Sequence, residues 1–462
     1  MSENKKKIRN LSLFALTWPI FIEALLHMLM GNADTLMLSQ YSDDSVAAVG
    51  VSNEVMRFIV VMFGFIATGT SVLIAQQLGA DNAKKAKEVA VVALAANLIS
   101  GLVLSLFLIF GSSMIFNLMG LDESLLGEAS LYLAIVGGFA FVQALLMTCG
   151  AILRSHRFTR DVMYVTVGMN ILNIIGNYLV IFGPFGLPVY GVTGVAIVTA
   201  GCRFLGLIVI FSVLLKRING SLPFAYLFQG IPRIELRNLL KIGIPTAGEH
   251  FSFNTMQLLI TSFIATIGTE ALTTKVYTQN LMMLVLLCAL AIGQGTQIII
   301  GYHVGAKNLN AAYKRCISSL KIAVCLSTSV AIMFYLLSKP LLGIFTDNVE
   351  IITMGSTLLL LAIIIEPGRT FNVICINSLR AAGDAKFPVY IGIFSMWLIC
   401  VPIAYLLGIH FGLGLIGVWI AFAVDEWFRG IFMLRRWKQG KWREMSFVTE
   451  TKEKQGDGSP AS

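Results

Sequence analysis

Residues of the first half of the chain recur in the second half at a constant offset of 226 positions, as in 245 − 19 = 226 and 308 − 82 = 226. The matched residues are Pro19/Pro245, Glu23/Glu249, Gly69/Gly295, Gly79/Gly305, Asn82/Asn308, Arg154/Arg380 and Arg203/Arg429. An ungapped duplication in a chain whose AVILMFWYC residues reach 56% is typical of a membrane transporter built from two related helical bundles. The repeat therefore predicts one scaffold that is used twice.

The hydropathy of the chain excludes a soluble globular protein of this length. Charged residues make up 13% and the mean hydropathy is +0.80, whereas soluble domains have about 25% charged residues. A membrane-spanning helix needs about 20 apolar residues, which predicts an all-α polytopic membrane protein with twelve spans. The predicted spans are 12–39, 53–78, 88–117, 128–153, 162–183, 190–215, 239–267, 276–304, 314–345, 352–380, 388–409 and 413–436.

The loops between these spans alternate in charge. Basic residues follow the even-numbered spans, as in Lys84, Arg157 and Lys307, whereas the opposite loops carry acids such as Asp43 and Asp122. The positive-inside rule places both termini in the cytoplasm, and we expect a multi-pass protein of the bacterial inner membrane. The net charge of +9 then reflects topology, so no nucleic-acid partner is expected.

The repeat and the loops also predict the domain organisation. We expect an N-terminal six-helix lobe at 1–216, a cytoplasmic linker at 217–238, a C-terminal six-helix lobe at 239–438 and a cytoplasmic tail at 439–462. An even number of spans in each half makes the lobes insert in the same direction, related by a pseudo-twofold axis along the membrane normal. This leaves a cleft between the lobes of what we expect to be a monomer.

One acidic residue breaks the repeat, since Asp34 has Ile260 as its counterpart. Glu23, His27 and Asp34 stand at i, i+4 and i+11 of the first span, so they share one helix face. Ionisable groups inside spans are costly and usually functional. Asp34 lies about six residues, roughly 9 Å, below the outer end of its helix. The alternative role is a helix cap, or a contact with water at that end.

The fifth span carries a stripe of amides at matching depth. Asn170, Asn173 and Asn177 lie at i, i+3 and i+7, with Asn177 about as deep as Asp34 and with Thr199 on the sixth span at a comparable level. A carboxylate, amide oxygens and a hydroxyl form an oxygen site for a small monovalent metal cation such as Na⁺, and they would equally tune a proton-carrying Asp34. Alternatively, the amides are hydrogen-bonding links between helices.

Other charged residues within spans are predicted to act as gates, as ligands for substrate charge, or as structural pairs. Glu23 and Glu249 are related by the repeat, which favours a structural or gating role. His27, one turn after Glu23, does not help to distinguish these roles from a role in binding substrate. Glu366 and Arg369 are spaced i, i+3 and can pair on one helix face. That pair is either self-neutralised or open to competition from substrate or a proton.

A further charged cluster lies on the last span. Asp425 and Glu426 stand four and three residues before Arg429, which predicts internal compensation near the inner surface. Elsewhere the chain contains no G-x-x-x-x-G-K-[ST] nucleotide-binding loop. It also shows no nucleophile–base arrangement, so we expect neither an enzyme nor a bound cofactor. Transport would then be passive or would draw on an ion gradient.

The chain resembles the MATE (multidrug and toxic compound extrusion) family of transporters. The resemblance rests on Pro19 with Asp34 in the first span, on the Gly79-Ala80 loop and on the Leu379-Arg380-Ala381-Ala382-Gly383-Asp384 element. It implies a cation-coupled antiporter that exports cationic, amphipathic compounds against Na⁺ or H⁺. It further implies a cation site at Asp34, Asn173, Asn177 and Thr199.

The resemblance is incomplete in the C-terminal half. One branch of the family has acidic residues in spans seven and ten, where this chain has Phe253 and Arg369. A second ion site there is therefore not implied. The main alternative function is a lipid-linked precursor flippase of related architecture, which would need a broad cationic cleft. The candidate cleft residues in the sequence are mainly acidic, which favours the drug exporter; a membrane enzyme and a channel are weaker alternatives.

Overall fold

The computed structural model describes residues 12–186, 188–218, 222–228, 230 and 232–448, and no strand occurs within these ranges. The α-helices are α2 (Leu13–Ser39), α3 (Asp43–Gly79), α4 (Ala83–Met119), α5 (Glu123–Gly138), α6 (Ala140–Ser155), α7 (Thr159–Phe182), α8 (Gly191–Arg217), α9 (Arg233–Ile267), α10 (Thr269–Gly305), α11 (Leu309–Leu336), α12 (Ser338–Gly343), α13 (Val349–Ala382), α14 (Lys386–Ser395), α15 (Val401–Tyr405) and α16 (Gly414–Gln439). Shorter helical elements are η1 (Pro184–Gly186), η2 (Phe224–Phe228), η3 (Met396–Cys400), η4 (Leu406–His410) and η5 (Lys441–Glu444). The prediction of an all-helical protein is confirmed.

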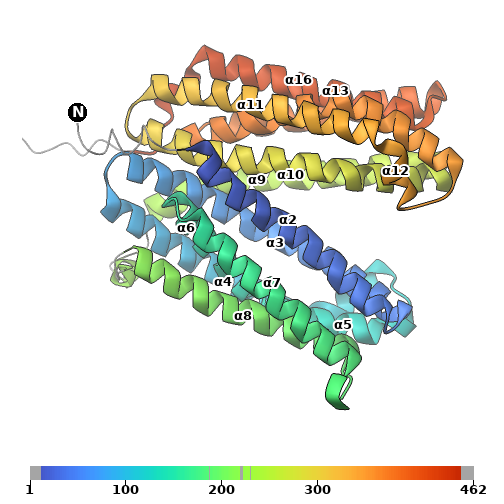
Figure 1. The fold of residues 1–462 in the computed structure, drawn as a ribbon. Helices are drawn as coiled ribbons and strands as arrows, with labels where there is room; N and C mark the ends of the chain where they lie inside the picture. The colour runs from blue at the N-terminus through green and yellow to red at the C-terminus, as the bar shows by residue number, and fades with distance from the viewer. Residues whose placement is uncertain (1–11, 187, 219–221, 229, 231, 449–462) are drawn as a thin grey trace, which may run out of the picture.

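The helices form two bundles, which we call the N-bundle (α2–α8) and the C-bundle (α9–α16). Figure 1 shows them as two layers that approach each other at one end and separate toward the other. The turns 80–82, 156–158 and 306–308 lie at the converging end, which we call the basic end because Lys84, Arg157 and Lys307 lie there. The elements of both bundles occur in the order that the duplication predicts.

The duplication also repeats the turns at the basic end. Asn82 and Asn308 cap α4 and α11 by accepting hydrogen bonds from the backbone N–H three residues on, at 3.2 and 3.3 Å. The residues just before them, Asp81 and Lys307, adopt positive φ angles of 61° and 56°. Two short polar sequences therefore build the same tight turn in each bundle.

Nine helices of the described part of the chain are long and apolar enough to cross a membrane, or ten when the α5–α6 pair, bent by 44°, counts as one span. Helices α9 and α16 complete the twelve; each carries buried charged residues that lower its hydropathy. Several predicted boundaries were wrong. The second span begins at Asp43 instead of 53, and the ninth is broken at Leu337 between α11 and α12.

The linker and the tail are more ordered than their polar composition suggests. Helix α9 begins at Arg233, inside the predicted linker, and η5 continues the chain beyond α16. Trp442 of η5 stacks on Trp437 with ring centroids 4.1 Å apart. The Phe447 N–H then donates to Gln76 Oε1 at 2.8 Å, so the C-bundle chain reaches the N-bundle. The predicted tail at 439–462 lies within the described residues only as far as residue 448.

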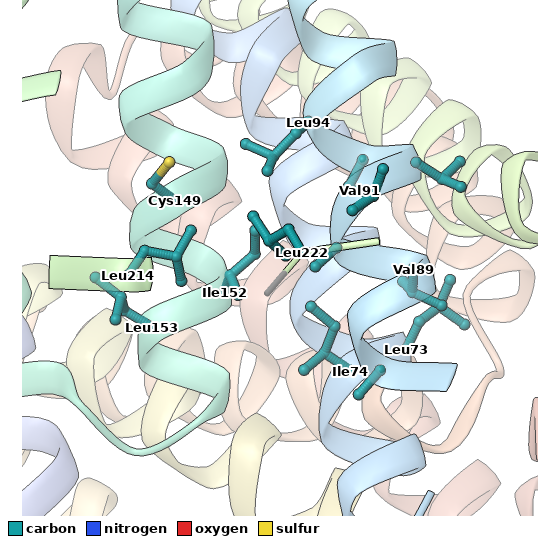
Figure 2. Close-up of a cluster of buried hydrophobic side chains, with 14 of the residues drawn as sticks. Leu73, Ile74, Val89, Val91, Leu94, Cys149, Ile152, Leu153, Leu214 and Leu222 are labelled. Carbon is teal, nitrogen blue, oxygen red and sulfur yellow. The ribbon is translucent and has the colours of Figure 1, made fainter. Parts of the chain in front are cut away.

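Each bundle has a core of buried, mainly apolar side chains. Figure 2 shows one such cluster, in which Leu73, Val91, Ile152 and Leu214 come from four different helices, α3, α4, α6 and α8. All four side chains are at most 2% exposed. Within a membrane such contacts stabilise helix association by close packing, since lipid is as apolar as the core.

The bundles touch closely at the basic end. A Cβ added at Gly79 would collide with the Tyr302 carbonyl, and one added at Gly305 would collide with the carbonyl of Gln76. Tyr302 Oη donates to the Ser155 carbonyl at 2.9 Å across the same junction. Only glycine permits this backbone approach, and the repeat supplies one from each bundle.

Candidate functional site

The structure brings Asp34 together with the three residues at matching depth. Asn177 of α7 donates from Nδ2 to Asp34 Oδ1 at 2.8 Å and to Asn173 Oδ1 at 3.2 Å. Asn173 in turn donates to Thr199 Oγ1 of α8 at 3.3 Å. The amides and the hydroxyl are buried, whereas Asp34 is half-buried. We call these four residues the Asp34 network; its role stays a prediction.

The network has donors and acceptors arranged around a carboxylate. Asn177 Oδ1 is buried and has no partner among the residues that the structure describes. A flip of this amide would exchange the positions of its nitrogen and oxygen. Asp34, Asn173 and Asn177 would then present oxygens to one another, as a small cation requires. The same side chains can therefore hold a bare carboxylate, a protonated one, or a cation.

Arg203 is a neighbour of this network that the sequence analysis did not assign. It lies one turn after Thr199 on α8, and its charge acts on Asp34 without a direct ion pair. Its Nη1 is buried and has no hydrogen-bond partner in the described ranges. The sequence did contain a signal for Arg203, because the repeat places Thr199 where the C-bundle has the acidic Asp425. Arg203 therefore lacks the local acid that its counterpart has.

His27 and Asn170, also predicted to contribute, lie beside the network and are not bonded within it. His27 is within electrostatic range of Glu23, Arg154 and Arg203, on the face of α2 that the spacing predicts. Asn170 is 5% exposed, and its Nδ2 has no partner among the described residues. Polar groups thus recur along this face of α2, from the half-buried Glu23 and Asp34 to His27, whose side chain is exposed.

Glu23 and Glu249 each pair with an arginine. Arg154 Nη1 lies 2.9 Å from Glu23 Oε1, and Arg380 Nη2 lies 2.6 Å from Glu249 Oε2. All four residues are related by the repeat, so each bundle contains the same ion pair. The geometry agrees with a structural or gating role, which remains a prediction.

The C-bundle holds a larger cluster of charges. Glu366 and Arg369 pair at 2.7 Å, as their spacing predicts. Arg429 contacts Asp425 at 2.5 Å and Glu426 at 3.1 Å. Arg369 also reaches Glu426 at 3.4 Å, so two clusters that the sequence suggests are separate form one across α13 and α16. Three carboxylates face two guanidinium groups there.

A cavity of about 890 Å³ lies between the bundles. Its charged lining residues are Arg57, Arg154, Lys275, Arg369, Arg380, Arg429, Glu249 and Glu426. The expectation of a mainly acidic cleft was therefore wrong. Sequence shows which spans carry carboxylates but not which way they face, and Asp34, Glu23 and Glu366 lie outside this lining.

The comparisons with known proteins identify the family. The MatE family model matches residues 19–179 and 245–406, two segments whose starts differ by the offset of the internal repeat. The chain belongs to the MATE family. MATE proteins are transporters and not enzymes, so this chain is a multi-pass membrane transporter of small molecules.

Relatives match this MATE transporter over almost its whole length. The uncharacterized transporter YisQ of Bacillus subtilis is 54% identical over 434 residues, which cover 94% of this chain and 95% of YisQ. The probable multidrug resistance protein NorM of Thermotoga maritima is 28% identical over 448 residues, which cover 96% of this chain and 95% of NorM.

Solved structures share the fold of this MATE transporter. An outward-facing multidrug resistance transporter of the MATE family superposes with a TM-score of 0.86 at 21% identity, covering 96% of this chain and 99% of that one. At this level of identity the likeness concerns the fold alone, which is the twelve-helix arrangement of the family.

Proposed function

We propose that this MATE transporter is a cation-coupled antiporter that uses Na⁺ or H⁺ entry to export amphipathic drugs or toxic compounds, with coupling at Asp34. The observation that carries the proposal is the Asp34 network, in which a carboxylate, two amides and a hydroxyl are joined by hydrogen bonds, and in which Asp34 and Asn173 have only isoleucines as counterparts in the second repeat. Relatives named as multidrug resistance proteins support the export of drugs. The proposed setting is the bacterial inner membrane with both termini cytoplasmic.

Helix α2 offers a mechanical link between the ion and the cavity. Asp34 lies near one end of α2, and Thr17 near the other packs against Gly295 of α10, where a Cβ would be 2.6 Å from Thr17 Cγ2. Pro19 lies between them and removes one helical hydrogen bond, which makes this a place where α2 can bend. An ion that changes the contacts of Asp34 would reposition α2 against the C-bundle.

Alternating access follows from these contacts. With the basic end closed and facing the cytoplasm, as proposed, the cavity would be in the state in which substrate leaves and the coupling ion enters. Protonation of Asp34, or a cation there, weakens its bond to Asn177, because the acceptor loses its negative charge or shares it with the ion. The resulting movement of α2 would then loosen the basic-end junction and expose the cavity to the cytoplasm.

A second candidate function is the flippase of related architecture. The six basic residues that line the cavity favour it, because lipid-linked precursors carry phosphates. Most of those charges are already neutralised by carboxylates, however. The antiporter therefore remains the better-supported function.

The test is dye efflux from vesicles in which Na⁺ and pH gradients are imposed separately. Wild-type protein is expected to export an amphipathic dye such as a rhodamine under at least one gradient, and Asp34→Asn to abolish that export while remaining folded in the membrane. Asp347→Asn, the same change at an exposed loop position, is the matched control. Normal efflux by Asp34→Asn would show that coupling lies elsewhere.

A further inference from the structure

The cations that line the central cavity differ in whether they have a partner. Five are arginines, and each lies within 2.9 Å of a carboxylate oxygen. The pairs are Arg57–Glu54, Arg154–Glu23, Arg369–Glu366, Arg380–Glu249 and Arg429–Asp425. These guanidinium groups are neutralised by the protein itself and have little charge to offer a ligand.

Lys275 of α10 is different. Its side chain lines the cavity, is only 6% exposed, and hydrogen-bonds through Nζ to the hydroxyl of Thr261. Among the described residues, no carboxylate lies within ion-pair distance of it. An ammonium group has three donors, and one hydroxyl replaces little of the hydration lost on burial. Lys275 is thus a buried positive charge that the protein leaves uncompensated.

The cavity wall beyond Lys275 suits the body of an amphipathic molecule. Gln279 lies one turn along α10 and also lines the cavity, followed by Met283, Leu286 and Leu290. The stretch from Lys275 to Leu290 spans roughly 22 Å at 1.5 Å per residue. The Lys275 end, which also carries the amides of Gln279 and Asn280, is therefore followed by an apolar face from Met282 to Leu290, roughly 12 Å long.

We propose that Lys275 binds an anionic group, a carboxylate or sulfonate, at one end of the transported molecule. The inference rests on the proposed function in taking the cavity as the substrate site. It replaces the cationic amphiphiles that the family resemblance implies with amphipathic anions and zwitterions. An incoming carboxylate supplies the counter-charge that the protein lacks, while the apolar remainder lies along Met283 and Leu286.

The experiment measures equilibrium binding of two fluorescent dyes to purified protein in nanodiscs. One dye is a rhodamine with a free carboxylate, and the other is the methyl ester of the same dye. Wild type should bind the acid more tightly than the ester. Lys275→Gln should weaken acid binding about tenfold or more, as expected for the loss of a charged hydrogen bond, and leave ester binding unchanged. Lys275→Arg should restore acid binding.

Two control variants separate this role from a structural one. Arg57→Gln removes the same charge from the same cavity at a residue that has its own carboxylate, and it should change acid binding less than Lys275→Gln. Thr261→Val removes the hydroxyl partner and keeps the ammonium, so acid binding should be preserved. The affinity for the acid dye should also be the same in nanodiscs of neutral lipid and in nanodiscs of anionic phosphatidylglycerol. Weaker binding in the anionic nanodiscs would indicate that Lys275 binds a lipid headgroup instead.

The outcomes are separable from those of the efflux test, because binding requires no ion gradient. Failure of ion-driven efflux in wild type would reject the antiporter and leave the binding result standing. Equal losses for acid and ester in Lys275→Gln, no loss for either, or binding of neither dye by wild type would overturn the anionic substrate.

Discussion

Arg154 donates from one nitrogen to both carboxylate oxygens of Glu23, at 2.9 and 3.1 Å. The same contact recurs at the equivalent positions of the second repeat, where Arg380 donates to Glu249 at 2.6 Å. The duplication has therefore preserved a pair of interacting residues, each 131 positions apart in the chain, and not only helix-shaping prolines and glycines. In both bundles the arginine lines the central cavity.

These pairs predict that removing one partner is costly. Glu249→Gln leaves the buried Arg380 without its counter-charge, which should lower the free energy of unfolding by about 3 kcal/mol. Thermal unfolding in detergent would measure this. Exchanging the two residues, Glu249→Arg with Arg380→Glu, should recover part of the loss. Wild-type stability in the single variant would rule out a structural role.

The Asp34 network predicts a contrast between two amides of α7. Asn177→Ala removes the only protein hydrogen bond to Asp34 in the described residues and should reduce ion-driven dye efflux about tenfold, since a charged hydrogen bond contributes about 1.5–3 kcal/mol. Asn170→Ala, two turns away and outside the network, should have a much smaller effect. Efflux is the measurement, and equal effects of the two variants would contradict the assignment.

Arg203 predicts a change in ion affinity. Because its charge acts on Asp34, it competes with a coupling cation. Arg203→Gln should therefore lower, by about tenfold, the Na⁺ or H⁺ concentration that gives half-maximal efflux. Arg429→Gln is the repeat-matched control; it should destabilise the fold because Asp425 and Glu426 lose their partner. An unchanged ion requirement in Arg203→Gln would remove Arg203 from the coupling site.

The glycine contacts predict a shift between conformations. Gly79→Ala and Gly305→Ala place a methyl group against the backbone of the other bundle, which should open the basic end. Spin labels at Lys84 and Lys314 should then report a longer distance than in wild type. Gly127→Ala has open space around its Cβ and should leave the distance unchanged. Equal distances in all variants would contradict a closed basic end.

Much of the fold could be predicted from residue types alone. Long apolar segments must become helices in a membrane because lipid cannot satisfy backbone hydrogen bonds, and the repeat indicated how they divide into halves. The helix ends were harder to place. Helix α3 begins at Asp43 because Ser42 caps it and two acids fill its first turn, signals that the hydropathy of the segment does not contain.

The candidate site was predictable where it depends on depth along a helix. Asp34 and Asn177 stand at equal distances from their helix ends, and the structure bonds them directly. Arg203 was missed, because its relation to Asp34 depends on how α8 is rotated against α2. A helix rotation moves a side chain from one face to another without any change in hydropathy.

The sequence by itself determined the helical class, the duplication and the unmatched carboxylate of Asp34 in the first span, because membrane burial and chain length constrain these directly. Only the tertiary structure decided which charges face one another and which face the cavity. Arg57, Arg369 and Arg429 pair with carboxylates of their own helices. The neutralisation of Arg154 and Arg380, and the isolation of Lys275 in the cavity wall, depend instead on contacts between helices. Those contacts arise from packing, which selects among many orientations that the same residue pattern allows.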